Sequence, residues 1–276
     1  MSSATSAGSI PRFAGVREVT QARVALSEWT KLHSLRSTRW SLLAATLLTI
    51  GLPLLFAAVT SSHWGSMGPH ERADRHPLDI ALVGVNVSQL AIAVLGVLMI
   101  TGEYSTGMIR ASFTAVPKRL PVLWAKTGVY ALFAFLLMLP PVLIAFFASQ
   151  AILSRHHILQ ISFSHPGVAR AVIGGAVYLM LVGVFALAIG AIIRNTAGGI
   201  ATFAAIFFVI PPLLNVLPTS WNHAISPYLP DSAGRAIFSL DHGAHNLAWG
   251  PGLALFCGYA VLAIAIAAVL LVRRDT

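Results

Sequence analysis

The sequence predicts an all-α integral membrane protein with six transmembrane helices. Of its 276 residues, 57% are hydrophobic and only 10% are charged, and the mean hydropathy is +0.79. Soluble domains carry about 25% charged residues, so a chain of this composition does not fold in water as an ordinary globule. A bilayer core of about 30 Å needs about 20 apolar residues per spanning helix. The chain therefore has room for six spans and their connections, and little else.

Six apolar runs are long enough to cross the hydrocarbon core. None shows the weak alternating pattern of a membrane β-barrel strand, so each run is expected to be a helix. The runs cover residues 40–59, 80–101, 123–149, 168–193, 197–217 and 247–272. Residues 40–276 are therefore predicted to form one six-span transmembrane domain.

The chain before the first span divides into two parts. Residues 1–15 are rich in Ser, Ala and Gly and lack an apolar core, so we expect a disordered tail and not a signal peptide. In residues 16–39, apolar side chains recur at three- and four-residue spacing, which is typical of an amphipathic helix at the membrane interface. Glu28, Trp29 and Lys31 lie at its centre. This helix is expected to anchor the chain to lipid, and it is also a candidate for part of a docking surface.

The basic residues predict the orientation of the chain. Thirteen of the 18 Lys and Arg residues flank the spans on the side that holds both termini, and the net charge of +9 falls on that side. The positive-inside rule makes this side cytoplasmic, so the chain is expected in the cytoplasmic membrane with both termini in the cytoplasm. Topology and contact with anionic lipid headgroups explain the basic residues, and no nucleic-acid-binding motif accompanies them.

The stretch between the second and third spans, residues 102–119, is the most informative in the chain. Gly102 can end the second span, and Glu103 stands where a helix N-terminus favours negative charge. Pro117 ends the helical pattern. A helix of two or three turns needs the membrane or a partner to order it. Its apolar side consists of Tyr104, Met108, Ala111 and Ala115.

The second span also carries three polar residues, Asn86, Ser88 and Gln89. Polar side chains in hydrocarbon usually face other helices and form hydrogen bonds across the contact. Helix packing is therefore the expected role of these residues, with the lining of a translocation path as the alternative.

Prolines interrupt two spans and the segment that follows the fifth. Pro140-Pro141 lies near the middle of the third run, and Pro211-Pro212 near the outer end of the fifth. Each proline removes a backbone donor and tends to kink a helix, so these pairs are either hinges or features of a fixed shape. The region 211–246 is apolar and broken by further prolines, which favours short re-entrant or interfacial helices over a plain loop.

Several kinds of chemistry are absent from the sequence. There is no P-loop motif, no H-E-x-x-H pair and no G-x-S-x-G elbow, so neither ATP binding nor hydrolytic catalysis is expected of this chain. No Asp, Glu, Lys or Arg falls in the middle of a span, which disfavours a self-sufficient ion-coupled pump. Most histidines lie in outer loops, so no metal site is expected. The single Cys257 forms no intrachain disulfide. Any transport would need energy from a partner.

In their order along the chain, these features resemble those of type-2 ABC transporter permeases, particularly the actinobacterial type. Such permeases have an N-terminal amphipathic helix, six spans, a coupling helix between spans two and three, and re-entrant helices between spans five and six. The positions that match the coupling helix are Glu103, Gly107-Met108, Pro117 and Lys118-Arg119, and the N-terminal helix reads Ser27-Glu28-Trp29-Thr30-Lys31-Leu32. The resemblance covers essentially the full chain.

The resemblance implies the membrane subunit of an exporter for a drug, antibiotic, lipid or similar substrate. It implies a second permease copy, the same or a sister chain, and two soluble P-loop ATPase subunits that bind ATP and Mg. This chain itself is expected to bind no cofactor. The residues expected to contact the ATPase are Glu103, Tyr104, Gly107, Met108, Arg110, Phe113, Pro117 and Arg119 in the coupling helix, and Glu28, Trp29 and Lys31 in the N-terminal helix.

Two alternatives of other classes stay open at the level of the sequence. One is a membrane-anchoring or immunity protein without a transport role. The other is a membrane-embedded enzyme, which would need ionisable groups clustered at one depth. A neighbouring gene for a soluble P-loop ATPase would favour the transporter over both.

Overall fold

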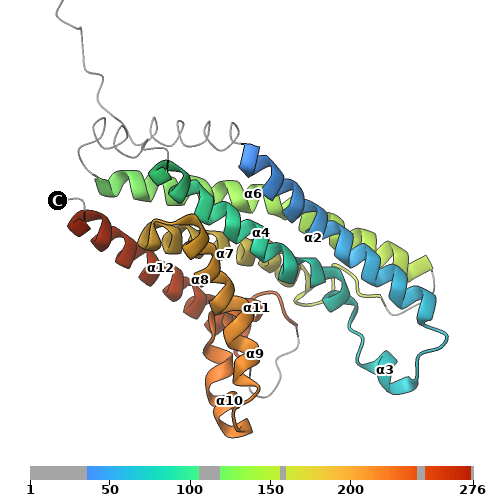
Figure 1. Ribbon diagram of the computed structural model, residues 1–276. Helices are drawn as coiled ribbons and strands as arrows, with labels where there is room; N and C mark the ends of the chain where they lie inside the picture. Colours follow the sequence, from blue (N-terminus) through green and yellow to red (C-terminus); the bar gives the residue numbers. More distant parts are fainter. Residues whose placement is uncertain (1–35, 106–118, 156–159, 241–245, 275–276) are drawn as a thin grey trace, which may run out of the picture.

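The computed structural model describes residues 36–105, 119–155, 160–240 and 246–274, and within these ranges the chain is helical and contains no strand (Figure 1). Six helical segments are long and apolar enough to cross a membrane, which confirms the predicted all-helical, six-span architecture. They are α2 (Arg36–His63), α4 (Pro77–Ser105), α6 (Arg119–Arg155), α7 (Val168–Ile193), the composite α8 (Thr196–Ala204), η1 (Ala205–Val209) and α9 (Ile210–Leu214), and α12 (Trp249–Arg274).

The predicted tail, most of the N-terminal amphipathic helix and most of the coupling segment lie outside the described residues. The helices α2, α4 and α6 run beyond the apolar runs of the sequence, whereas the fifth helical segment ends at Leu214, before the predicted end at residue 217. The first apolar run starts at residue 40, whereas α2 already begins at Arg36. The third run covers 123–149, whereas α6 extends from Arg119 to Arg155. Hydropathy marks the part of a helix that suits hydrocarbon, and a helix can continue past that part into the polar interface.

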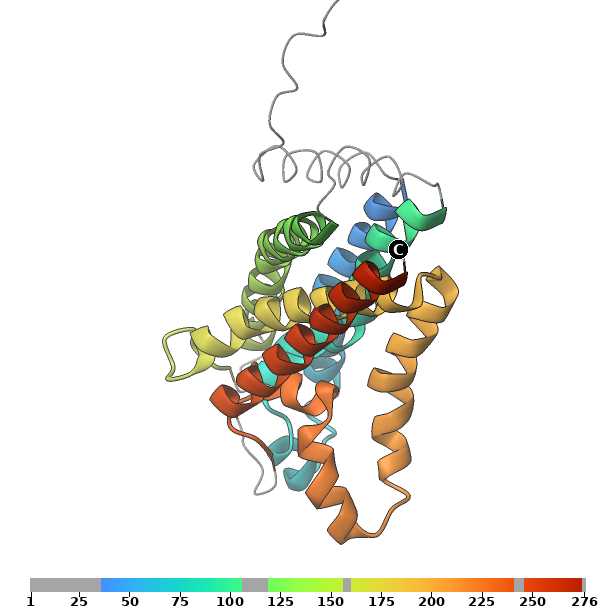
Figure 2. The same cartoon turned by 90° about the vertical axis from the view of Figure 1, so that its left-hand side faces the viewer.

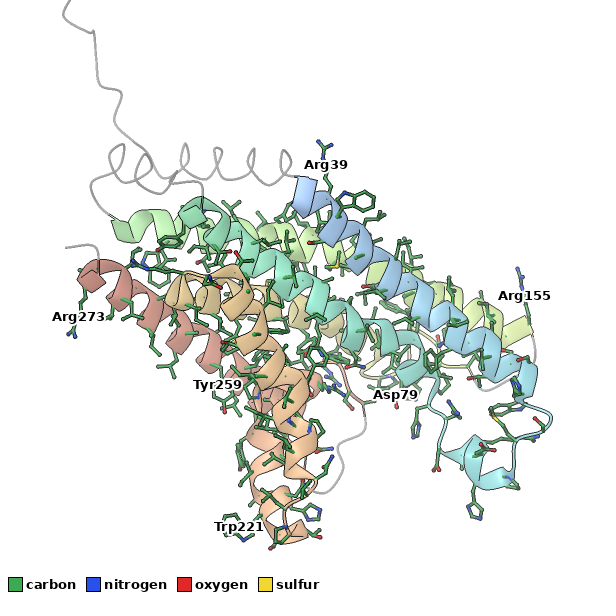
Figure 3. All side chains as sticks on the ribbon, viewed as in Figure 1. Arg39, Asp79, Arg155, Trp221, Tyr259 and Arg273 are labelled. Carbon is green, nitrogen blue, oxygen red and sulfur yellow. The ribbon has the colours of Figure 1, made fainter. Side chains whose placement is uncertain are left out.

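Successive spans run in opposite directions, so each end of the bundle holds the beginnings of three spans and the ends of the other three. The helices α2, α6 and α8 begin at the end where α4, α7 and α12 finish. We call this the basic end because Arg39 and Arg273 lie there (Figure 3), as does Arg194 at the end of α7. The opposite end carries Arg155, Asp79 at the start of α4, and the short helix α3 (Pro69–Ala73) (Figure 3).

The centre of the bundle is the contact between α4 and α7. Of the most apolar stretch of each helix, 72% is buried in α7 and 61% in α4. Small residues let the backbones approach: a Cβ on Gly190 would stand 3.2 Å from the Cα of Val97, and one on Gly84 would stand 2.5 Å from the carbonyl of Thr49 in α2. Close approach at glycine is the usual way in which helices pack within a membrane.

The prolines predicted to break the third and fifth spans act differently. Pro140 and Pro141 lie inside α6 without ending it. In the fifth span, the five residues before α9 form a π-helix, in which the N–H of Ile210 bonds to the carbonyl of Ala205. Pro211 and Pro212 have no N–H to offer to the carbonyls four residues earlier, and a wider turn accommodates that loss.

After the fifth span the chain turns back. The helix α10 (Thr219–Ile225) returns beside α9 (Figure 2), and the side-chain amide of Asn222 donates to the carbonyl of Leu214 at 3.1 Å. The 3₁₀ turn η2 (Ser226–Tyr228) and the helix α11 (Pro230–Arg235) follow before the sixth span begins. Short helices therefore join the fifth and sixth spans.

Candidate functional site

Most of the predicted ATPase-contacting residues belong to parts of the chain other than the described ranges. Glu28, Trp29, Lys31, Gly107, Met108, Arg110, Phe113 and Pro117 lie outside the described residues. Glu103 belongs to the last turn of α4 and Arg119 to the first turn of α6, but their side chains are not described. Tyr104 is the member of the set whose side chain is described, and its surroundings therefore define the candidate site at the basic end.

Tyr104 lies against the turn between α7 and α8. The guanidinium carbon of Arg194 stands 5.1 Å from the centre of the Tyr104 ring. A cation over an aromatic face contributes about 0.5–2 kcal/mol, depending on how well water is excluded. The half-buried Tyr104 ring also packs against the core cluster, so the last turn of α4 is fixed to the body of the bundle.

Arg194 adopts an unusual backbone conformation. Its φ of 58° is in the left-handed region, and no other non-glycine residue in the described ranges has a positive φ. This conformation ends α7, with the N–H of Arg194 bonded to the carbonyl of Gly190 at 2.8 Å. A left-handed residue with a side chain costs about 1–2 kcal/mol. The contact with Tyr104 is one interaction that offsets this strain.

A second contact joins the same two elements. The hydroxyl of Thr196, in the first turn of α8, donates to the hydroxyl oxygen of Thr101 at 2.8 Å. Thr101 is 2% exposed, and its hydroxyl donates to the carbonyl of Val97 at 2.9 Å. The hydroxyls of the two threonines thus form one ordered chain of donors and acceptors. We call Thr101, Tyr104, Arg194 and Thr196 the turn cluster.

The backbones beneath the turn cluster are in close contact. A Cβ on Gly199 of α8 would stand 2.9 Å from a methyl of Val97, and Gly190 of α7 lies against the backbone of the same residue. The side chain of Asn195 caps α8 by accepting from the N–H of Gly198 at 2.9 Å. The last turns of α4 are therefore wedged against both helices that meet at this turn.

One basic residue near this end is not a surface charge. Lys126, in the first turns of α6, is 2% exposed. The sequence places Lys126 with the basic residues that flank the spans, whereas the structure buries its side chain.

A second polar cluster lies inside the bundle. The hydroxyl of the fully buried Tyr178 in α7 donates to the side-chain oxygen of Gln89 in α4, and it stands 3.4 Å from a carboxylate oxygen of Asp231 in α11. Asp231 is 5% exposed and paired with Arg235, whose Nε is 3.0 Å from its Oδ2. We call Gln89, Tyr178, Asp231 and Arg235 the inner cluster.

Further contacts hold the chain around α11 against the spans. Arg170 donates from its two guanidinium NH₂ groups to the carbonyls of Ile237 and Ser239, at 2.9 and 3.0 Å. Tyr259 of α12 (Figure 3) donates to the carbonyl of Tyr228 at 2.6 Å. Arg170 thereby supplies donors to two backbone carbonyls outside the spanning helices, where an unsatisfied group is costly if water is excluded.

These contacts define how far the chain reaches along the spans. Arg170 lies near the start of α7, and Tyr178 lies eight residues further, about 12 Å at 1.5 Å per residue. Tyr259 lies ten residues after the start of α12, about 15 Å by the same measure. The segment from Tyr228 to Ser239 therefore contacts α12 through Tyr259 and α7 through Tyr178 and Arg170.

The three polar residues of the second span have different surroundings. Ser88 is buried and donates to the carbonyl of Val85 in its own helix at 3.3 Å, and Gln89 is buried in the inner cluster. Asn86 is half-buried, with its side-chain oxygen buried and without a hydrogen-bond partner among the described residues. The role of these residues in lining a path stays a prediction.

Sequence reasoning missed Tyr178, Asp231 and Arg194. The i,i+4 spacing of Asp231 and Arg235 is a sequence signal for the ion pair, but the partners of Tyr178 are 89 and 53 positions away along the chain. Among the described residues, no group of three or more histidine, cysteine or acidic side chains is placed to hold a metal ion. Comparison of the chain with protein-family models and with curated proteins finds no match.

Proposed function

We propose that the chain is the membrane-spanning subunit of an ATP-binding-cassette exporter. It would move a drug, antibiotic, lipid or similar substrate across the cytoplasmic membrane with energy from a separate P-loop ATPase. In this proposal the basic end faces the cytoplasm, residues 103–119 form the coupling surface for the ATPase, and two permease chains pair.

The observation that carries this proposal is the path of the chain between the fifth and sixth spans. The contacts of Tyr228 with Tyr259, of Asp231 with Tyr178, and of Ser239 with Arg170 hold three points of this connecting segment against α12 and α7, which supports a segment that dips between the spans. Such a path is what a re-entrant segment requires, and re-entrant helices at this place belong to the family that the sequence resembles. Backbone that is not part of a spanning helix is tolerated at this depth only where protein surrounds it.

The arrangement of the helix ends also supports the proposal. The last residue of α4 and the first residue of α6 lie at the basic end, and residues 106–118 connect them. Thirteen of the 18 Lys and Arg residues belong to stretches of the sequence that adjoin the helix ends at this side. A coupling surface for a cytoplasmic ATPase has to lie at this end.

The test is purification of the tagged chain from its native membrane in mild detergent, followed by identification of the proteins that co-purify. We expect a stoichiometric P-loop ATPase that is lost when residues 104–115 are scrambled. A matched control scrambles residues 64–75 at the opposite end, and it should retain the ATPase. A solitary chain, under conditions that preserve other membrane complexes, would contradict the proposal and favour an anchoring protein.

Within the described ranges, no structural observation favours the alternatives of a different class. An embedded enzyme would need reactive ionisable side chains free to meet a substrate, and the buried carboxylate of the inner cluster, that of Asp231, is already paired with Arg235.

A further inference from the structure

The turn cluster ties the helix that leads into the proposed coupling segment to the start of the fifth span. Thr101 and Tyr104 are the last described side chains of α4 before residues 106–118. Their partners, Arg194 and Thr196, lie on either side of the residue that caps α8. Two contacts of different chemistry, a cation over a ring and a hydroxyl pair, therefore connect the same two elements.

The fifth span is otherwise loosely held by this chain. Only 17% of its apolar stretch is buried, against 72% for α7. Its own inward anchors are Phe203 and Phe207, whose rings stack with centroids 4.3 Å apart. Apart from these anchors few packing contacts oppose movement of the span, so its first turn follows the element that holds it.

The conformation of Arg194 restricts how the turn can move. A left-handed residue with a side chain occupies a narrow, costly region of backbone space, and only surrounding contacts keep it there. Adjacent to it, Asn195 caps α8 and fixes the direction in which the helix leaves the turn. The turn is therefore a rigid corner and not a flexible joint.

We propose that the turn cluster passes movement from the coupling segment to the fifth span, with Arg194 and Thr196 as its positioning residues. This inference rests on the proposed exporter function and specifies which span the coupling segment moves first. A displacement of the end of α4 carries the corner with it through Tyr104–Arg194 and Thr101–Thr196. The corner then moves α8, and the Tyr104–Arg194 and Thr101–Thr196 contacts persist through the cycle of ATP hydrolysis.

The experiment uses the complex of the chain with its co-purified ATPase in lipid nanodiscs. Cys257, the one cysteine of the sequence, is replaced by alanine, and spin labels are placed at Ala201→Cys in α8 and Val261→Cys in α12, both of which are exposed. The distance between the labels is measured without nucleotide and after trapping with ATP and orthovanadate. We expect trapping to change the distance, and we expect Arg194→Gln combined with Thr196→Val to abolish the change.

Two controls separate coupling from folding. Arg194→Lys keeps a cation over the ring and should retain the distance change, and Thr196→Ser keeps the hydroxyl. The combined variant should still co-purify with the ATPase and hydrolyse ATP, because neither residue belongs to the proposed coupling surface. A merely structural role would lower thermal stability and lose the complex instead, which would overturn the inference.

A reversible cross-link tests whether the contact persists. The hydroxyl oxygens of Thr101 and Thr196 are 2.8 Å apart, so Thr101→Cys with Thr196→Cys brings two sulfurs within reach of a disulfide. Because the two elements are proposed to move together, the oxidised complex should hydrolyse ATP at the rate of the reduced one. Inhibition that reductant reverses would overturn the inference.

The remaining outcomes separate this inference from the proposed function. If the ATPase co-purifies but the distance change survives the combined variant, the turn cluster is not the route and the exporter function stands. If trapping moves no label in the unmodified complex, the inference fails while the association stands. If no ATPase co-purifies, the proposed function fails and the inference falls with it.

Discussion

The α4–α7 pair and the fifth span are built by different means. The pair is joined by glycines that bring backbones together, and more than half of each apolar stretch is buried. The fifth span is short, contains a π segment followed by two prolines, and turns only Phe203, Phe207 and Gly199 fully inward. The comparison indicates a stiff centre with a weakly packed helix beside it, which is fixed chiefly by its aromatic anchors and by its first turn.

The anchors of the fifth span should give the largest effect. Phe207 is 2% exposed and contacts Phe203, Phe185 and Phe256. Phe207→Ala should lower the free energy of unfolding by about 3–5 kcal/mol, because it opens a cavity where few other contacts hold the span. Thermal unfolding in detergent measures this. The matched control is Phe208→Ala, at a 39% exposed neighbour, and an equal loss there would contradict the anchor role.

The second largest effect should come from adding a side chain at the contact between α4 and α7. A Cβ on Gly190 would stand 2.9 Å from a methyl of Ile100 and 3.2 Å from the backbone of Val97. Gly190→Ala should destabilise by about 1–3 kcal/mol, since overpacking a rigid contact forces backbones apart. Gly258→Ala in α12 is the control, because a Cβ there meets nothing within 4 Å. Comparable melting temperatures for the two variants would show that the centre is not tightly packed.

The inner cluster should show an intermediate loss. Tyr178→Phe leaves the buried side-chain oxygen of Gln89 without its donor, which costs about 1–3 kcal/mol. The exposed Tyr228 offers a control, because its contact with Tyr259 uses the backbone carbonyl and Tyr228→Phe leaves it intact. Unfolding that is unchanged by Tyr178→Phe would mean that the cluster does not hold α11.

The smallest effect should come from the turn. Arg194→Gly relieves a left-handed strain of about 1–2 kcal/mol but removes a ring contact of similar size, so its net effect on stability should be near zero. Arg194→Ala keeps most of the strain and loses the contact, so it should be the less stable of the two. If alanine were the more stable, the left-handed conformation would not be a cost.

The sequence predicted well what depends on composition. A run such as 168–193 has no charge in its middle and enough length to cross a bilayer, and the structure has a helix over the same residues. The effect of the prolines was harder to predict from the sequence. The neighbours of a helix decide whether a proline kinks it, widens one of its turns or only removes a hydrogen bond. Pro140-Pro141 is absorbed within α6, whereas a π segment precedes Pro211-Pro212.

The inner cluster was beyond the reach of the sequence for a related reason. The middle of every span is free of charge in the sequence, and this argued against ionisable groups among the helices. Asp231 reaches Tyr178 from a connecting segment, which no hydropathy pattern along one span can reveal. Arg194 is one of the basic residues that flank the spans in the sequence, and its position over Tyr104 follows from a turn conformation that residue type alone disfavours.

The central claim is that the basic end of the bundle faces the compartment that holds ATP. In a Cys257→Ala background, one cysteine replaces the exposed Ala197 at the basic end and another replaces the exposed Ser66 at the opposite end. Intact cells are treated with a membrane-impermeant maleimide. Our account predicts labelling of Ser66→Cys in intact cells, and of Ala197→Cys only after permeabilisation. The reverse pattern would place the turn cluster and the proposed coupling surface outside the cell and contradict the account.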